Sequence, residues 1–229
     1  MLTPAEWQAV GLSLRVAVAA TLLSLPFALA VAWLLSRTRF VGRPIIDAAV
    51  HSPLVLPPVV VGYLLLLLFG ARGPIGRWLH DALGVRLVFT TAGAALAAAV
   101  MSFPLLVRAL RLSMEAVDRG LETAARTLGA SRLDAFCTVT LPLMLPGILS
   151  GAIVAFAASL GEFGATITFA SNIEGETRTL PLAIYTATQT PDGDRTALRL
   201  VTISLSLALA ALVGAEWLHR RLHRRLGRP

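Results

Sequence analysis

Residues 118–146 read DRGLETAARTLGASRLDAFCTVTLPLMLP and separate two strongly apolar runs, where a loop would be expected. Within them, Leu121, Ala124, Ala125 and Leu128 fall at i, i+3, i+4 and i+7, which places them on one face of a helix. The stretch therefore predicts a short helix between two apolar segments.

The ends of this short helix are also marked in the sequence. Asp118 is a residue type that caps helix starts, and Gly129 can take the left-handed conformation that ends a helix. Ser131 followed by Asp134 resembles a capping box, which begins a new helix. The sequence therefore predicts two short helices joined near Gly129.

The apolar face of the first helix consists of small residues, two alanines and two leucines, so another surface can approach its backbone closely. Glu122 and Arg126 stand on the other side at i,i+4 and predict a local ion pair. Such a helix suits a groove in a partner protein. The alternative is an interfacial helix that rests on lipid headgroups.

The composition is that of a membrane protein. Of 229 residues, 56% are hydrophobic and 14% charged, and the mean hydropathy is +0.74. The net charge of +7 comes from 20 arginines, with no lysine, against 13 acids. The arginines lie in short loops and in the tail, which is typical of membrane loops and does not favour nucleic-acid binding.

Long apolar runs with few charges predict an all-α integral membrane protein with about five spans. The predicted transmembrane domain covers 10–218, and a basic cytoplasmic tail follows over 219–229. The five spans are expected at about 12–36, 48–70, 87–107, 143–170 and 198–217. A surface helix is expected over 73–84, and a short apolar helix near 179–185.

The second span is irregular, because Pro53, Pro57 and Pro58 stand in its first half, before Gly62. Broken backbone at membrane depth is tolerated where protein or a water-filled cavity meets it. We therefore expect Pro57, Pro58 and Gly62 on the translocation path or at its gate. Alternatively, the prolines lie at a helix entrance, where they cost little.

The third and fourth spans carry further signals. The third is rich in Ala and Gly, which predicts a central place in the bundle, since small residues let helices pack closely in lipid. Glu162 lies within the fourth, and a carboxylate at membrane depth is a functional hypothesis by default. It could accept hydrogen bonds from backbone or from Thr166 in a structural or gating role. Alternatively, it lies in the outer interface, where its cost is low.

The arginines also predict the orientation. One side of the membrane would hold 13 of them and the other six. We therefore expect the richer side to be cytoplasmic, the N-terminus outside and the C-terminus inside. The 13 are Arg37, Arg39, Arg43, Arg108, Arg111, Arg119, Arg126, Arg132, Arg220, Arg221, Arg224, Arg225 and Arg228.

The sequence contains no nucleotide-binding P-loop, because that motif needs a lysine. ATP hydrolysis, if it drives this protein, is expected on another chain. No metal site is expected either. The single Cys137 excludes an intrachain disulfide, and we interpret it as a small buried apolar residue.

Four segments resemble the molybdate and sulfate permeases of binding-protein-dependent ABC importers, and the molybdate permeases most. Residues 122–142 resemble the EAA loop of that family, with Thr123 where the motif suggests Ala. The other three are SPLVLPPVVVG (52–62), GEFGAT (161–166) and NIEGETRTLPLAIY (172–185). Together they cover most of the chain.

The resemblance implies the bundle of a type I ABC importer permease in the inner membrane, with cytoplasmic coupling helices and no enzymatic activity of its own. It implies a homodimer, two ATP-binding subunits that carry ATP and Mg²⁺, and an external molybdate-binding protein. The residues expected to couple to the ATPase are Asp118, Leu121, Glu122, Ala124, Ala125, Leu128 and Gly129.

Other functions remain as alternatives. A sulfate, thiosulfate or tungstate permease would share these motifs, since the anions share shape and charge. An intramembrane enzyme would need paired ionisable groups in the spans, and Glu162 has no evident partner there. A secondary transporter would predict inverted repeats, and none is evident.

Overall fold

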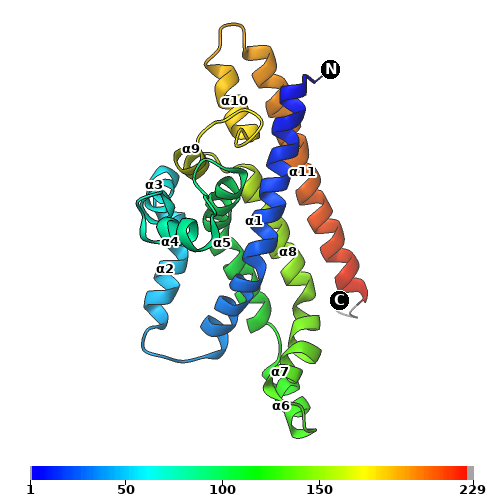
Figure 1. The fold of residues 1–229 in the computed structure, drawn as a ribbon. Coiled ribbons are helices and arrows are strands. Elements are labelled where there is room, and N and C mark those ends of the chain that lie inside the picture. Colours follow the sequence, from blue (N-terminus) through cyan, green and yellow to red (C-terminus); the bar gives the residue numbers. More distant parts are fainter. Residues whose placement is uncertain (1, 226–229) are drawn as a thin grey trace.

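The computed structural model describes residues 2–225, and helices with no strand make up the fold of that range (Figure 1). The predicted all-α architecture is therefore confirmed. The helices are α1 (Pro4–Arg37), α2 (Arg43–Val55), α3 (Pro58–Phe69), α4 (Pro74–Leu83), α5 (Thr91–Glu115), α6 (Arg119–Thr127), α7 (Arg132–Ala135), the π-helix η1 (Phe136–Thr140), α8 (Leu141–Leu160), α9 (Gly164–Ala170), α10 (Leu180–Thr188) and α11 (Asp194–Arg225).

Four helical segments of the described chain are long and apolar enough to cross a membrane. They are α1, α5, the continuous run Arg132–Leu160 and the part of α11 from Asp194 to Gly214. Helices α2 and α3 pass the same test only as a pair, bent by 118° at their junction. Counting that broken pair gives five spans, which confirms the predicted number and the predicted irregularity of the second.

Helix α5 lies at the centre of the bundle. Its alanines Ala94, Ala97 and Ala98 are fully buried, and it packs against α1 and α8. More than half of its apolar stretch is buried, against about a tenth for α11, which lies along one side (Figure 1). The small residues of α5 therefore bring neighbouring helices close, as predicted.

The fourth span differs from its predicted range of 143–170. Its helix begins at Arg132, because the chain passes through a π-turn at Phe136–Thr140 into α8 without a break. It ends at Leu160 with Gly161 as its C-cap, and residues 164–170 form the separate helix α9. The prediction of one span to residue 170 was therefore wrong, since an apolar run does not show where a helix stops.

The surface helix α4 and the short helix α10 form where the sequence predicts them. Helix α10 and the start of α1 lie at one end of the bundle, and α6 and α7 project from the opposite end (Figure 1). The backbone of α11 continues to Arg225, while the side chains of the tail predicted over 219–229 lie outside the described residues.

Candidate functional site

Helix α6 has the ends that its sequence predicts. The carboxylate of Asp118 accepts a hydrogen bond from the Gly120 amide at 2.8 Å and caps its start. Leu128 is the C-cap, and Gly129 follows with φ +98°. The amide of Ala130 then donates to the carbonyl of Ala125 at 3.1 Å, which closes the turn. A non-glycine residue at 129 would be strained in this conformation.

The apolar face of α6 is open. No residue of the helix is buried; Leu121 is 47% exposed and Leu128, just beyond its end, is 89% exposed. Ala124 is exposed between them, and Ala125 is half-buried. Because α6 projects beyond the end of the bundle, this face is free to contact another molecule (Figure 1). We name Leu121, Ala124, Ala125 and Leu128 the α6 face.

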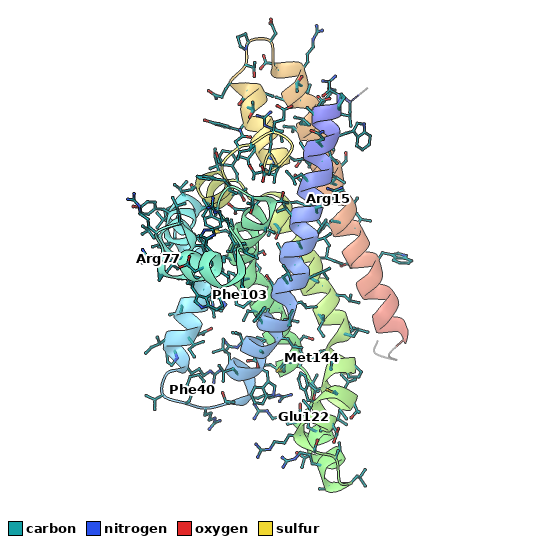
Figure 2. The ribbon with its side chains drawn as sticks, in the orientation of Figure 1. Arg15, Phe40, Arg77, Phe103, Glu122 and Met144 are labelled. Atoms are coloured by element: carbon teal, nitrogen blue, oxygen red, sulfur yellow. The ribbon has the colours of Figure 1, made fainter. Side chains whose placement is uncertain are left out.

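Glu122 does not make the predicted pair with Arg126. Its carboxylate instead lies 2.8 Å from the guanidinium of Arg37, and it accepts a hydrogen bond from the Thr140 hydroxyl at 2.5 Å. The tertiary fold explains this choice of partner, because the C-terminal end of α1 and the π-turn both lie beside α6 (Figure 2). The two side chains are 11% and 26% exposed, so the pair is largely shielded from water.

Two further hydrogen bonds tie this region together. Arg37 also donates to the carbonyl of Met114 near the end of α5, at 3.3 Å. Arg119, the first residue of α6, donates to the carbonyl of Ser36 at 3.2 Å. The second predicted helix begins at the capping box of Ser131 and Asp134. Helix α6 is thus attached by side chains to α1 and to the π-turn that leads into α8.

The broken helices meet at a second place. Pro57 is the N-cap of α3 and Pro58 its first residue. A Cβ on Gly62 would lie 2.7 Å from the Ala165 carbonyl, and a Cβ on Gly164 would lie 2.8 Å from the Cβ of Pro58. Helices α3 and α9 therefore touch at backbone distance, and both positions need glycine.

Glu162 occupies the junction between α8 and α9. Its carboxylate accepts a hydrogen bond from the Ala165 amide at 2.8 Å, so it caps the start of α9. This is the backbone interaction that the sequence suggests, and it fixes the helix that packs on α3. Among the described residues, no group of His, Cys, Asp and Glu has the arrangement of a metal site.

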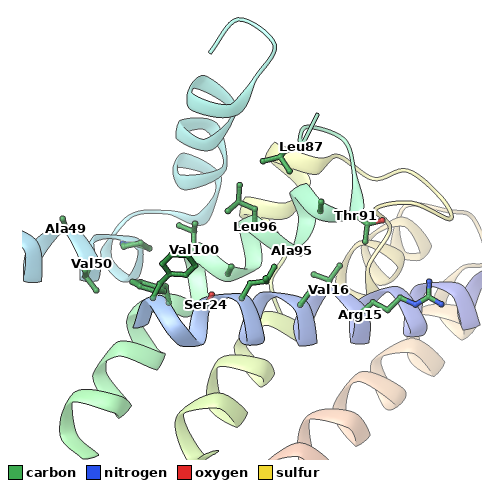
Figure 3. Close-up of a pocket in the computed structure, with 17 residues that line it drawn as sticks. Arg15, Val16, Ser24, Ala49, Val50, Leu87, Thr91, Ala95, Leu96 and Val100 are labelled. Atoms are coloured by element: carbon green, nitrogen blue, oxygen red, sulfur yellow. The ribbon is translucent and has the colours of Figure 1, made fainter. Parts of the chain in front are cut away.

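An apolar cavity of about 840 Å³ lies between α1, α2 and α5 (Figure 3). Its walls are apolar apart from Ser24, Thr91 and one charged residue, Arg15. Pro57, Pro58 and Gly62 do not line it; they lie at the α3–α9 contact instead. The sequence alone does not show the position of Arg15 at this cavity, because that position depends on how α1 packs against α5.

Comparison with known proteins gives the family. Residues 11–228 match the family described as the binding-protein-dependent transport system inner membrane component. The chain belongs to this family. It is therefore an inner-membrane permease with several spans, and the resemblance noted in its motifs is confirmed.

The relatives are molybdenum and sulfate permeases. The molybdenum transport system permease protein ModB of Escherichia coli K12 is 59% identical over the full length of both chains. ModB of Haemophilus influenzae is 53% identical over 97% of each. The sulfate transport system permease protein CysT of Escherichia coli K12 is 37% identical over 87% of this chain and 72% of its own.

Solved structures agree on the fold. A chain of the methionine ABC transporter MetNI in inward-facing conformations superposes with a TM-score of 0.72 at 16% identity, over 97% of this chain and 99% of its own. A chain of a bacterial alginate ABC transporter, in complex with its periplasmic protein, gives 0.76 at 16% identity over 96% and 80%. At these identities the likeness concerns the fold, which is that of ABC importer permeases.

Proposed function

We propose that this chain is the membrane-spanning subunit of an ATP-driven importer that carries molybdate across the inner membrane. The observation that carries the proposal is the 59% identity with ModB over the full length of both chains. Sulfate is the second candidate, because CysT is also a relative, at 37% identity over part of its length. Tungstate and thiosulfate have the same shape and charge as these anions and form further alternatives.

The assembly we propose contains two copies of this chain, two ATP-binding subunits and an external protein that delivers the oxyanion. ATP and Mg²⁺ would bind to the ATP-binding subunits, and this chain would catalyse no bond chemistry. The end of the bundle that carries α6 and α7 would face the cytoplasm, with the N-terminus outside and the C-terminus inside. The arginine-rich segments at that end support this orientation.

The α6 face is the proposed contact with the ATP-binding subunit. Closure of the two ATP-binding subunits on ATP would move α6, and the Arg37–Glu122 ion pair would carry that movement to α1. The hydrogen bond from Thr140 to Glu122 would carry it to the π-turn and α8. In energetic terms, ATP binding shifts the population between two packings of the helices because it favours one of them.

The proposed path for the anion begins near Arg15. A guanidinium at the edge of an apolar cavity attracts a dianion that has left its delivery protein, without holding it through many contacts. The α3–α9 contact at Pro58, Gly62 and Gly164 is the proposed gate, with Pro57 at its edge. Glu162 would act there by capping α9 and would not bind the anion, which it would repel.

Uptake in cells tests the proposal. A deletion strain grown at nanomolar molybdate should lose cellular molybdenum, measured by mass spectrometry, and should keep its uptake of labelled sulfate. Excess molybdate should restore molybdenum. Lost sulfate uptake with normal molybdenum would move the substrate to sulfate. If neither changed in a strain without a second importer, the proposed substrate would be wrong.

A further inference from the structure

A basic pocket lies beside the end of the bundle that carries α6 and α7, apart from the apolar cavity of Arg15. It has a volume of about 340 Å³ and is enclosed by the end of α1, the turn into α2, the end of α5 and the start of α6. Four arginines line it, together with one carboxylate, that of Glu115. The four are Arg37, Arg39, Arg43 and Arg119.

The charges in this pocket do not balance. Glu115 is bonded to Arg111 at 3.0 Å, outside the pocket, and Arg37 is paired with Glu122. The guanidinium groups of Arg39 and Arg43 make no hydrogen bond or ion pair with any other described residue, although the Arg43 amide donates to the Phe40 carbonyl at 3.2 Å. Two guanidinium groups therefore line the pocket without an ion-pair partner in the described part of the chain.

The backbone also contributes positive electrostatic potential at this pocket. Helix α2 begins at Arg43, and its N-cap Gly42 offers no side chain to the first amides. The N-terminal end of a 13-residue helix carries a partial positive charge, here on the same side as the guanidinium groups. The pocket therefore attracts an anion with groups from three separate helices.

We propose that this pocket binds a tetrahedral oxyanion group of the phosphate type. Guanidinium groups donate paired N–H bonds that match the oxygens of such an anion, and Arg39 and Arg43 are free to do so. Two sources present this group at a cytoplasmic membrane surface: the phosphate of an anionic lipid headgroup, and a free oxyanion in solution. The inference does not depend on which anion the permease transports.

An anion in this pocket would lie against residues that attach α6 to α1. Arg119 is the first residue of α6, and Arg37 holds Glu122, so two of the four arginines belong to the link between α6 and α1. A bound anion would bridge these residues to Arg39 and Arg43 on the turn into α2. It would therefore stabilise the conformation in which α6 is held against α1.

Binding can be measured on the full-length chain, purified with the subunits that accompany it. The test variant is Arg39→Gln with Arg43→Gln, which removes the two unpaired charges and breaks no described contact. The control is Arg72→Gln with Arg108→Gln, which removes the same charge outside the pocket. Unchanged thermal unfolding of the ligand-free proteins shows that both variants fold.

Two arms distinguish the sources. In the lipid arm, native mass spectrometry counts phosphatidylglycerol bound in competition with phosphatidylethanolamine. In the free-anion arm, the protein is reconstituted in nanodiscs that contain only zwitterionic lipid. Phosphate or molybdate is then added at increasing concentration, and the thermal unfolding temperature is measured at each concentration. We expect the test variant to weaken binding at least tenfold in one arm, and the control to stay within twofold. Equal loss in the control, or no binding by the parent protein in either arm, would overturn the proposal.

Discussion

Substitution of the Arg37–Glu122 pair tests the proposed link between α6 and the bundle. The two groups are 2.8 Å apart, and their side chains are 11% and 26% exposed. Exposed pairs contribute at most about 1 kcal/mol, and breaking a buried pair costs about 3–5 kcal/mol. For this intermediate burial we expect an interaction energy of about 2 kcal/mol, which is roughly a 30-fold change in an equilibrium constant.

The assay is a double-mutant cycle with Arg37→Gln, Glu122→Gln and both together. Glutamine at 122 can still accept the hydrogen bond from Thr140, so the cycle isolates the charge. The free energy of unfolding and the molybdate imported per ATP hydrolysed are measured for each protein. We expect Glu122→Gln to lower that ratio while ATP hydrolysis continues.

The matched control is the i,i+4 pair Glu174–Arg178, which lies at 2.7 Å with side chains 58% and 25% exposed, far from α6. Its interaction energy should be about 0.5 kcal/mol, without effect on transport. An interaction energy for Arg37–Glu122 within about 0.3 kcal/mol of zero, with an unchanged transport ratio, would refute the reasoning.

Three further predictions concern single residues. Gly129→Pro should leave the protein in the membrane and uncouple ATP hydrolysis from uptake, because proline cannot adopt φ +98°; normal uptake would refute the coupling role of α6. Gly62→Val should lower the melting temperature and reduce uptake by forcing α3 from α9, whereas Gly11→Ala, with no atom within 4 Å of the added Cβ, should change neither. Arg15→Ala should reduce molybdate uptake at low concentration and Arg15→Lys should retain most of it; equal uptake by all three proteins would remove Arg15 from the path.

The ends of α6 could be predicted because capping is local. Asp118 and Gly129 act on amides and carbonyls within a few residues of themselves, and the sequence shows those neighbours directly. The number of spans could be predicted for a similar reason, since each apolar run is continuous. These features need no knowledge of how the helices pack.

Other features could not be predicted, because they depend on distant parts of the chain. Glu122 has Arg126 one turn away, yet it pairs with Arg37, 85 residues earlier. Cys137, interpreted from the sequence as a buried apolar residue, is exposed in the π-turn that precedes α8, so that interpretation was wrong. The relation of Arg15 to the apolar cavity appears only when α1 is packed against α5.

The continuous helix from Arg132 to Leu160 connects two distant regions of the permease, so a tilt of this helix would move both of them. Its 29 residues span roughly 43 Å at 1.5 Å per residue. One arm ends beside α6, and the other ends at Gly161, next to the residue that caps α9. A tilt of about 10° around its middle would displace each end by roughly 4 Å in opposite directions, for arms of this length. A displacement of the arm beside α6 would thus move the end next to α9 and could separate α9 from α3, which lie far from α6.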